Sequence, residues 1–522
     1  MKHRLPRLLA MMLLAAPSAM AQTLGIGIAD AITSIDPHFL NSPTNKNAIC
    51  NVFDGLTDTD SRVDIEPALA ESWTLINDHT WEFKLRRNAR FHDGTPFTAT
   101  DAVASIARVP KLPNAPAPFT TYMRTITAMH VVDPHTVRME TDGLNPNLPA
   151  ELAQVRMIKA DLADSPTEDF NTGKAAIGTG PYRFVSYKPG ATVELERSEF
   201  YWGKPGHWKQ VTYRFITDGG ARVAALLAGD VQVIDFVPSD AMADLRKNER
   251  LRLVTSEIGL RFLFLALDQS RTGPTPFVTG PNGETLPSNP LLDVRVRRAL
   301  SLAINRPALM DRIMEGTATI SAQVMPRGGF GNDPTIADPP YDPDQARKLL
   351  AEAGFPNGLR ITIHSARGRW INDSRIVQAI AQMWQRIGVQ TSVELQPWSS
   401  YISKVQRTEF SVMMGSVAAV TGEASQPLRG ALGTRDPGRG FGGFNFGRYS
   451  NPDLDALLDQ SQRTADDRAR AALLWKAARI GVDQVGHIPL HLQRASWAMR
   501  RDIVYPGRSD DQTRLLAINP AP

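Results

Sequence analysis

Two arginines beside a tryptophan are the side chains in this sequence best suited to bind an anion. Arg367 and Arg369 flank Gly368, and Trp370 follows directly. A guanidinium group is planar and permanently charged, so it can hold a carboxylate or a phosphate through two parallel hydrogen bonds. The alternative for each arginine is a solvated residue of an exposed loop, and the sequence leaves both interpretations open.

Other patterns that could carry chemistry are weaker. His487 and His491 have the spacing of two metal ligands on one helix turn, but Pro489 between them favours a strand. The sequence contains no Cys/His cluster with zinc spacing, no G-x-S-x-G pattern and no outstanding carboxylate pair. Residues 178–180 read Gly-Thr-Gly without the Gly-Lys-Ser/Thr that a phosphate loop requires. We therefore expect no metal, no cofactor and no enzyme, an enzyme built on this fold being a distant alternative.

The first 21 residues have the order of a secretory signal. Lys2, Arg4 and Arg7 precede an apolar run over residues 8–16, which is too short to span a bilayer, and residues 19–21 read Ala-Met-Ala. We expect cleavage after Ala21 and a soluble protein in the periplasm, without a lipid anchor because no cysteine follows the site. Cys50 is the single cysteine, which excludes an intramolecular disulfide.

Length and charge limit the possible architectures and partners. A chain of 522 residues is too long for one ordinary core, so we expect two or three domains. Of its net charge of +4, three positive charges belong to the signal, which leaves +1. This small excess gives no support for a nucleic-acid partner, and we expect a monomer.

Several elements can be placed from pattern alone. Apolar and charged residues alternate over 81–86, which predicts a half-buried strand, and residues 72–76 predict its hairpin partner. Thr100 or Asp101 is expected to cap a helix that begins at Ala102.

In the second half of the chain, Asp293 and Asp342 are expected to cap helices, and residues 305–307 are expected to start another helix. Strands and helices alternate beyond them, which predicts a mixed or parallel sheet. The predicted elements are strand 359–364, helix 373–387, strand 389–395, helix 399–407 and strand 410–415.

The segment 68–103 reads ALAESWTLINDHTWEFKLRRNARFHDGTPFTATDAV and resembles the signature of extracytoplasmic solute-binding protein family 5. This family serves peptide, nickel and opine ABC importers. Ser34-Ile35-Asp36-Pro37-His38 is similar to its LDP turn, which leads into the ligand cleft, and 178–182 to its GTGPY turn. The resemblance covers nearly the whole chain after the signal.

The resemblance implies an α/β fold, namely a two-lobed periplasmic binding protein of type II with an extra α+β subdomain in the first lobe. Its crossings near Leu267 and Ile488 would form a hinge, and its partner would be an inner-membrane ABC permease. The implied division is signal 1–21, lobe I 22–55, extra subdomain 56–177, lobe I again 178–267, lobe II 268–487, and a return to lobe I over 488–522.

The resemblance also assigns residues to the ligand. Arg367 matches the arginine that holds the peptide carboxylate in dipeptide-binding relatives. Ser416 to Ala419 match a Trp-x-x-Asp whose Asp binds the peptide α-ammonium, so that carboxylate is missing here unless Glu423 replaces it. The candidate site residues are Asn41, Arg367, Arg369, Trp370, Ser416, Val417, Ala419 and Glu423.

These features predict the substrate-binding component of an ABC importer that closes on a small peptide or a peptide-like anionic solute. An opine, a sugar acid or a nickel chelate is the alternative. Because Ala419 leaves no anion for an amine, we expect an acid that needs no free α-amine.

Overall fold

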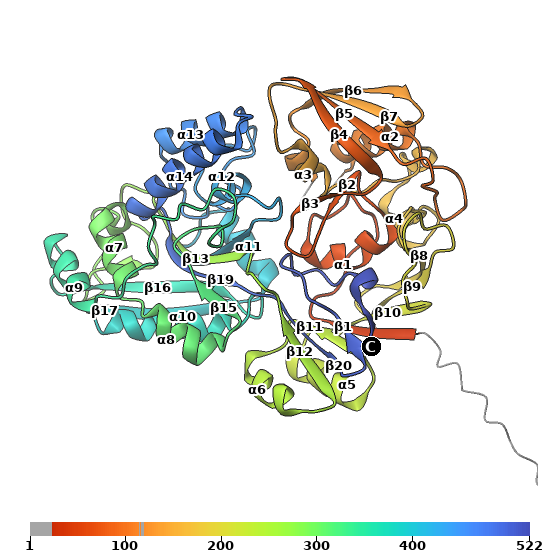
Figure 1. The fold of residues 1–522 in the computed structure, drawn as a ribbon. Coiled ribbons are helices and arrows are strands. Elements are labelled where there is room, and N and C mark those ends of the chain that lie inside the picture. Colours follow the sequence, from red (N-terminus) through yellow and green to blue (C-terminus); the bar gives the residue numbers. More distant parts are fainter. Residues whose placement is uncertain (1–22, 114, 116–118) are drawn as a thin grey trace, which may run out of the picture.

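The computed structural model describes residues 23–113, 115 and 119–522, so the predicted signal lies outside the described residues. Figure 1 shows two bodies, lobe I with both ends of the described chain and lobe II with most of the second half. Each lobe is built on its own seven-stranded sheet. The architecture is therefore the predicted two-lobed α/β fold.

The sheet of lobe I is mixed, because β1 pairs in parallel with β10 and β11 while the outer strands are antiparallel. Strand β20, from the end of the chain, lies between β11 and β12, so the C-terminal segment returns to lobe I. The strand order is β12 (Leu251–Thr255), β20 (Ser496–Arg500), β11 (Val233–Asp235), β1 (Thr23–Ile28), β10 (Gln210–Phe215), β9 (Thr192–Arg197) and β8 (Tyr182–Lys188). Its helices are α1 (Pro43–Val52), α4 (Thr167–Asn171), α5 (Gly219–Ala228) and α6 (Ser239–Lys247), and the short pairs are β2 (Thr57–Thr59) with β3 (Ile65–Pro67) and β21 (Ile503–Val504) with β22 (Asn519–Pro520).

The extra subdomain of lobe I has a separate apolar core between Leu56 and Met157. Its sheet has the order β4 (Ala70–Asn77), β5 (Thr80–Leu85), β7 (Thr136–Thr141) and β6 (Ile126–Asp133), and its helices are α2 (Ala99–Arg108) and α3 (Leu148–Leu152). The predicted alternation is confirmed, because Trp81, Phe83 and Leu85 are buried.

The two predicted caps of α2, Thr100 and Asp101, lie two and three residues after the actual cap. Thr98 is the N-cap, and Asp101 closes a capping box as the third helical residue. Both ends of a Thr-x-x-Asp box are polar, so the sequence alone does not show which polar residue of this segment is the cap.

The sheet of lobe II combines parallel and antiparallel strands. Strands β16, β17 and β18 are parallel, as the predicted strand–helix alternation requires. Its order is β14 (Val278–Thr279), β16 (Leu359–Ala366), β18 (Val412–Ala418), β13 (Arg261–Leu267), β19 (Ile488–Gln493) and β15 (Ala318–Ile320), with β17 (Val389–Gln396) beside β16. The helices are α7 (Val294–Leu302), α8 (Arg306–Leu309), α9 (Pro343–Glu352), α10 (Asp373–Gln385), α11 (Trp398–Gln406), α12 (Ser425–Ala431), α13 (Pro452–Gln462) and α14 (Asp467–Asp483). The predicted caps Asp293 and Asp342 each accept a main-chain N–H, and Asn305 does so at the start of α8.

The two crossings between the lobes lie one strand away from the predicted positions. Strands β13 and β19 belong to the sheet of lobe II, so the chain crosses over residues 256–260 and 494–495 and not near Leu267 and Ile488. The burial pattern identifies a strand but not the sheet that receives it. Ser256 N donates to Ala495 O at 2.8 Å, which joins the two crossing segments side by side.

The Asp36 turn is held by a buried network of hydrogen bonds and an ion pair. Arg108 Nη1 and Nη2 donate to the two carboxylate oxygens of Asp36 at 2.8 and 2.7 Å, and Thr167 Oγ1 adds a bond of 2.8 Å. Burial works to raise the pKa of Asp36, but Arg108 outweighs it and holds that pKa below its usual value. The turn therefore fixes the N-terminal segment to the extra subdomain.

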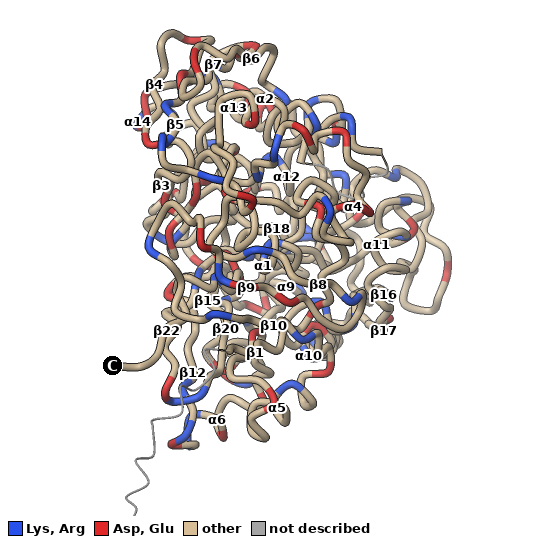
Figure 2. Tube along the Cα trace, turned by 90° about the vertical axis from the view of Figure 1, so that its right-hand side faces the viewer, with Lys and Arg blue, Asp and Glu red and all other residues tan. Residues whose placement is uncertain are grey.

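Basic and acidic residues are interspersed in the view of Figure 2, in agreement with the small net charge. Among the described residues, no helix is both long and apolar enough to cross a membrane.

Candidate functional site

A small cavity between the lobes collects charged side chains from both of them. We call it the interlobe pocket, and it is lined by Asp30, Thr44, Asn47, Asp235, Phe236, Arg261, Arg369 and Asp511. On the lobe I side it lies at the carboxyl ends of the parallel strands β1 and β11. Loops at the carboxyl ends of parallel strands are the usual ligand position in open α/β sheets. A larger cavity of about 370 Å³ has its whole lining in lobe II, mainly apolar residues.

Asp235 is the most deeply buried carboxylate of the pocket wall on the side of β11. It is 2% exposed, and its Oδ1 accepts a hydrogen bond from Ala29 N at 2.8 Å. Burial raises the pKa of Asp235 to about 7, because the low-polarity surroundings disfavour the charged form. Asp30, two residues beyond β1, is half-exposed by comparison.

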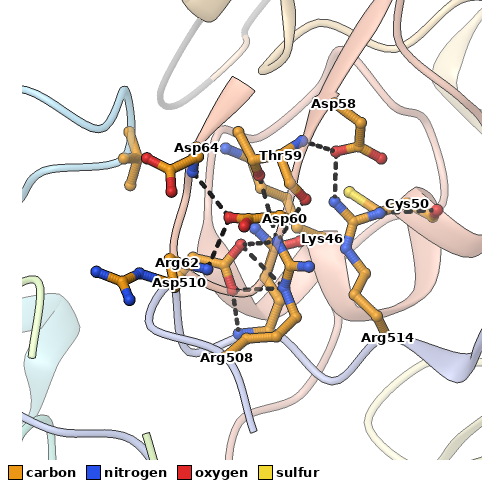
Figure 3. Close-up of polar contacts among 12 residues, drawn as sticks. Lys46, Cys50, Asp58, Thr59, Asp60, Arg62, Asp64, Arg508, Asp510 and Arg514 are labelled. Carbon is orange, nitrogen blue, oxygen red and sulfur yellow. Dashed lines mark hydrogen bonds and ion pairs between the residues drawn. The ribbon is translucent and has the colours of Figure 1, made fainter. Parts of the chain in front are cut away.

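The C-terminal tail supplies the third carboxylate, Asp511. Figure 3 shows how the tail is held: Arg508 Nη2 donates to Thr59 O at 3.0 Å, and Arg514 Nη2 donates to Asp58 at 2.9 Å. Burial works to raise the pKa of Asp58, but the arginines around it hold that pKa well below its usual range. These contacts fix the tail against α1 and β2 and so place Asp511 in the pocket.

Two ion pairs cross the pocket between the lobes. Arg261 donates to Asp511 Oδ2 through Nη2 at 2.6 Å and through Nε at 3.0 Å. Arg369 Nη1 lies 3.4 Å from Asp30 Oδ2, a longer and weaker contact at a partly exposed position. The first pair is therefore the shorter and better hydrogen-bonded of the two.

Arg369 belongs to a loop that the structure holds rigidly. The carboxylate of Asp373 accepts main-chain N–H groups from Gly368, Arg369 and Trp370 at 3.1, 2.8 and 3.2 Å. The Arg369 guanidinium lies 4.8 Å from the centre of the Trp398 ring, which is favourable for a cation. A guanidinium on a fixed loop loses little freedom when it binds a ligand.

Strained backbone is found at the same place. Phe236 and Asp511 have φ angles of 43° and 63°. This left-handed conformation is unfavourable for residues other than glycine. Such strain is often retained at functional sites, where the surrounding structure over-determines the geometry. Phe236 also packs against the core of lobe II, although it belongs to lobe I.

The two lobes are in contact around the pocket, so this is a closed arrangement. Polar bonds join them on both sides of the cavity. They are Asn147 Nδ2 to Glu423 Oε1 (2.5 Å), Gln154 Nε2 to Val420 O (3.0 Å) and Asn372 Nδ2 to Ser239 Oγ (2.6 Å).

The structure separates the two predicted arginines. Arg369 lines the pocket, whereas the side chain of Arg367 is exposed and its main-chain N–H donates to Gln396 O. Trp370 is buried behind the same loop, where its Nε1 donates to Ser416 Oγ at 2.9 Å. The structure thus brings Arg369, Trp370 and Ser416 together and leaves Arg367 outside.

Three other predicted positions have their side chains inside the protein. Val417 and Ala419 are buried in the core of lobe II. Glu423 is 5% exposed and forms an ion pair with Arg470. Asn41 donates to Tyr122 Oη at 3.1 Å and does not line the interlobe pocket.

Sequence reasoning missed Asp30, Asp235, Arg261 and Asp511. The two acids Asp30 and Asp235 had a usable signal, because Asp30 follows the apolar residues of β1 and Asp235 ends those of β11. Asp511 had none, since only the tertiary course of the tail brings it to the pocket.

Metal binding has no support in the part of the chain that the structure describes. There, no group of three or more His, Cys, Asp and Glu side chains is placed to hold a metal ion. His491 lies in β19, so the strand predicted between it and His487 is confirmed.

The sequence model for bacterial extracellular solute-binding proteins of family 5 matches residues 64–438. The chain belongs to this family. As a family 5 solute-binding protein, it has curated relatives along most of its length. It is 27% identical over 462 residues to heme-binding protein A of Haemophilus influenzae, covering 82% of this chain and 79% of the relative. It is 29% identical over 489 residues to the glutathione-binding protein GsiB of Escherichia coli O1:K1, covering 90% and 89%.

A solved structure gives the same fold for this solute-binding protein. The ABC transporter-associated periplasmic binding protein DppA of Helicobacter pylori, in complex with the peptide STSA, superimposes with a TM-score of 0.77. The sequences are 22% identical, and the match covers 95% of this chain and 98% of that chain.

Proposed function

We propose that this protein is the periplasmic substrate-binding component of an ABC importer and binds a small peptide or a peptide-like solute with an acid group. The observation that carries the proposal is the interlobe pocket, a small cavity of about 20 Å³ with charged side chains from both lobes. A ligand can contact both walls only in the closed form. It therefore stabilises the closed form relative to the open form. The closed, loaded protein would then deliver its ligand to the membrane permease.

The acid group of the ligand is assigned to Arg369. Its guanidinium lies on a rigid loop, and its present partner Asp30 is 3.4 Å away. A bidentate carboxylate would replace this weak contact with two charged hydrogen bonds. The proposal involves no catalytic step. Relatives support the ligand class only by analogy, since one is a glutathione-binding protein and a structural neighbour holds a peptide.

The test begins with protein purified from periplasm. Denaturation releases the co-purified ligand, and mass spectrometry identifies it. Small-angle scattering of the refolded protein is then measured with and without that ligand, and we expect a smaller radius of gyration when it is bound. A ligand without an acid group contradicts the role of Arg369, and an unchanged radius at saturation contradicts closure on the ligand. A non-peptide acid would identify the alternative substrate class.

A further inference from the structure

Asp235 lacks a cation partner within the interlobe pocket. Each arginine of the pocket is already paired with another acid. Arg261 is paired with Asp511, and Arg369 is paired with Asp30. Arg222 lies 4.0 Å from Asp235 Oδ1, but its guanidinium donates only to main-chain carbonyls among the described residues. The pocket therefore contains one carboxylate more than its guanidinium groups neutralise.

The second carboxylate oxygen of Asp235 is available to a ligand. The hydrogen bond from Ala29 N uses Oδ1, and no described residue donates to Oδ2. The side chain is 3% exposed and forms part of the pocket wall. Oδ2 is open to the pocket, so a ligand group can donate to it and form a charged hydrogen bond there.

We propose that Asp235 binds an ammonium group of the same ligand whose acid group Arg369 binds, so that the ligand is zwitterionic. This inference rests on the proposed function and narrows its substrate class to peptides or amino acid derivatives with a free amine. It replaces the expectation drawn from Ala419, because the anion that lobe II lacks is supplied by lobe I. A metal ion fits less well, since it needs several ligands and the described residues offer no such group.

Binding of an ammonium must be linked to the proton of Asp235. Burial raises its pKa to about 7, so at pH 6 a proton competes with the ligand amine for this carboxylate. We therefore expect amine-bearing ligands to bind more tightly at pH 8 than at pH 6. Arg222 lowers the pKa of Asp235, whereas Asp30 and Asp511 raise it. The other charged groups of the pocket are Arg261 and Arg369.

The experiment uses a tryptic casein digest as the probe, half of it treated with acetic anhydride so that its amines are blocked. The full mature protein is unfolded and refolded to remove bound ligand, and its thermal unfolding is measured with each half. We expect the untreated digest to stabilise the protein and the acetylated digest to have no effect. Calorimetry with the best-binding peptide should show about ten- to a hundredfold weaker binding after N-acetylation.

Two variants locate the effect. In Asp235→Asn the ratio between free and acetylated peptide should fall to about one, and the pH dependence between 6 and 8 should disappear. Asp344→Asn is the control, because it also removes one carboxylate but lies at an exposed position outside the pocket, and it should keep the ratio. If Asp235→Asn does not fold, the ratio between free and acetylated peptide is measured on the unaltered protein at pH 8 and at pH 6, and a ratio that does not fall at pH 6 contradicts the role of Asp235.

Three outcomes overturn the inference. Equal stabilisation by both digests, or stabilisation by the acetylated digest alone, contradicts the ammonium site and leaves solute binding intact. A ratio that survives in Asp235→Asn assigns the amine to another residue. Stabilisation by neither digest contradicts the ammonium site and the proposed peptide-binding function together.

Discussion

The Glu423–Arg470 ion pair should contribute to the stability of the protein and not to recognition of a ligand amine. Both side chains are buried, with exposed fractions of 6% and 10%. Asn147 completes the network, because it donates to Glu423 at 2.5 Å and accepts from Arg470 Nη1 at 2.8 Å. Glu423 is therefore already occupied by the protein itself.

Loss of the Glu423 charge should lower the free energy of unfolding by about 3 kcal/mol. Breaking a buried pair by removing one partner costs roughly 3–5 kcal/mol, because the other charge stays buried. In Glu423→Gln the amide still accepts a hydrogen bond, and Arg470 keeps Asp467 at 2.8 Å on its exposed side. These remaining contacts place the expected loss at the lower end of that range.

Urea denaturation of the ligand-free protein measures this loss. Asp344→Asn is the control, because it breaks an ion pair with Arg347 at an exposed position, where about 0.5 kcal/mol or less is expected. Calorimetry on free and N-acetylated peptide then gives the affinity ratio, which Glu423→Gln should leave unchanged. Unaltered stability together with a more than tenfold loss of the ratio would refute this reasoning and make Glu423 the amine partner.

Three further predictions concern export, acid stability and closure. N-terminal sequencing of periplasmic protein should begin at Gln22, and any other start contradicts the predicted cleavage site. Burial lowers the pKa of His487 and of His491 to about 3, so the stability that each neutral imidazole contributes above pH 6.5 should be lost as the pH falls, by about 1.4 kcal/mol per unit. His491→Leu should therefore flatten the decline between pH 6.5 and 5 in urea titrations, and an unchanged slope argues against this source. Asn147→Ala removes an interlobe contact and should increase the radius of gyration of the ligand-free protein in small-angle scattering. An unchanged radius would show that this contact does not hold the lobes together.

Local pattern predicted the elements well, because caps and periodicity depend on neighbouring residues. The caps at Asp293 and Asp342 and the buried face of residues 81–85 are examples. The lobe crossings were misplaced because a buried apolar strand such as β13 reads the same in either sheet.

The candidate site was predicted only on the lobe II side, and only in part. Spacing placed Arg367 and Arg369 in one loop, but it could not show which of the two lines the pocket, because Asp373 fixes the main chain of Arg369 whereas Arg367 N–H donates to Gln396 O. Asp511 reaches the pocket from the C-terminal end of the chain, and no local sequence pattern predicts its left-handed backbone conformation. Long-range contacts of this kind cannot be predicted from the local pattern of a single sequence.

A comparison of Arg369→Ala with Arg367→Ala tests the central claim most directly. The two residues share one loop, but only Arg369 lines the interlobe pocket. Calorimetry with the ligand identified from the periplasmic protein should show an affinity about ten- to a hundredfold weaker for Arg369→Ala and unchanged for Arg367→Ala. The opposite result, a loss with Arg367→Ala and none with Arg369→Ala, would contradict the assignment of the interlobe pocket as the ligand site.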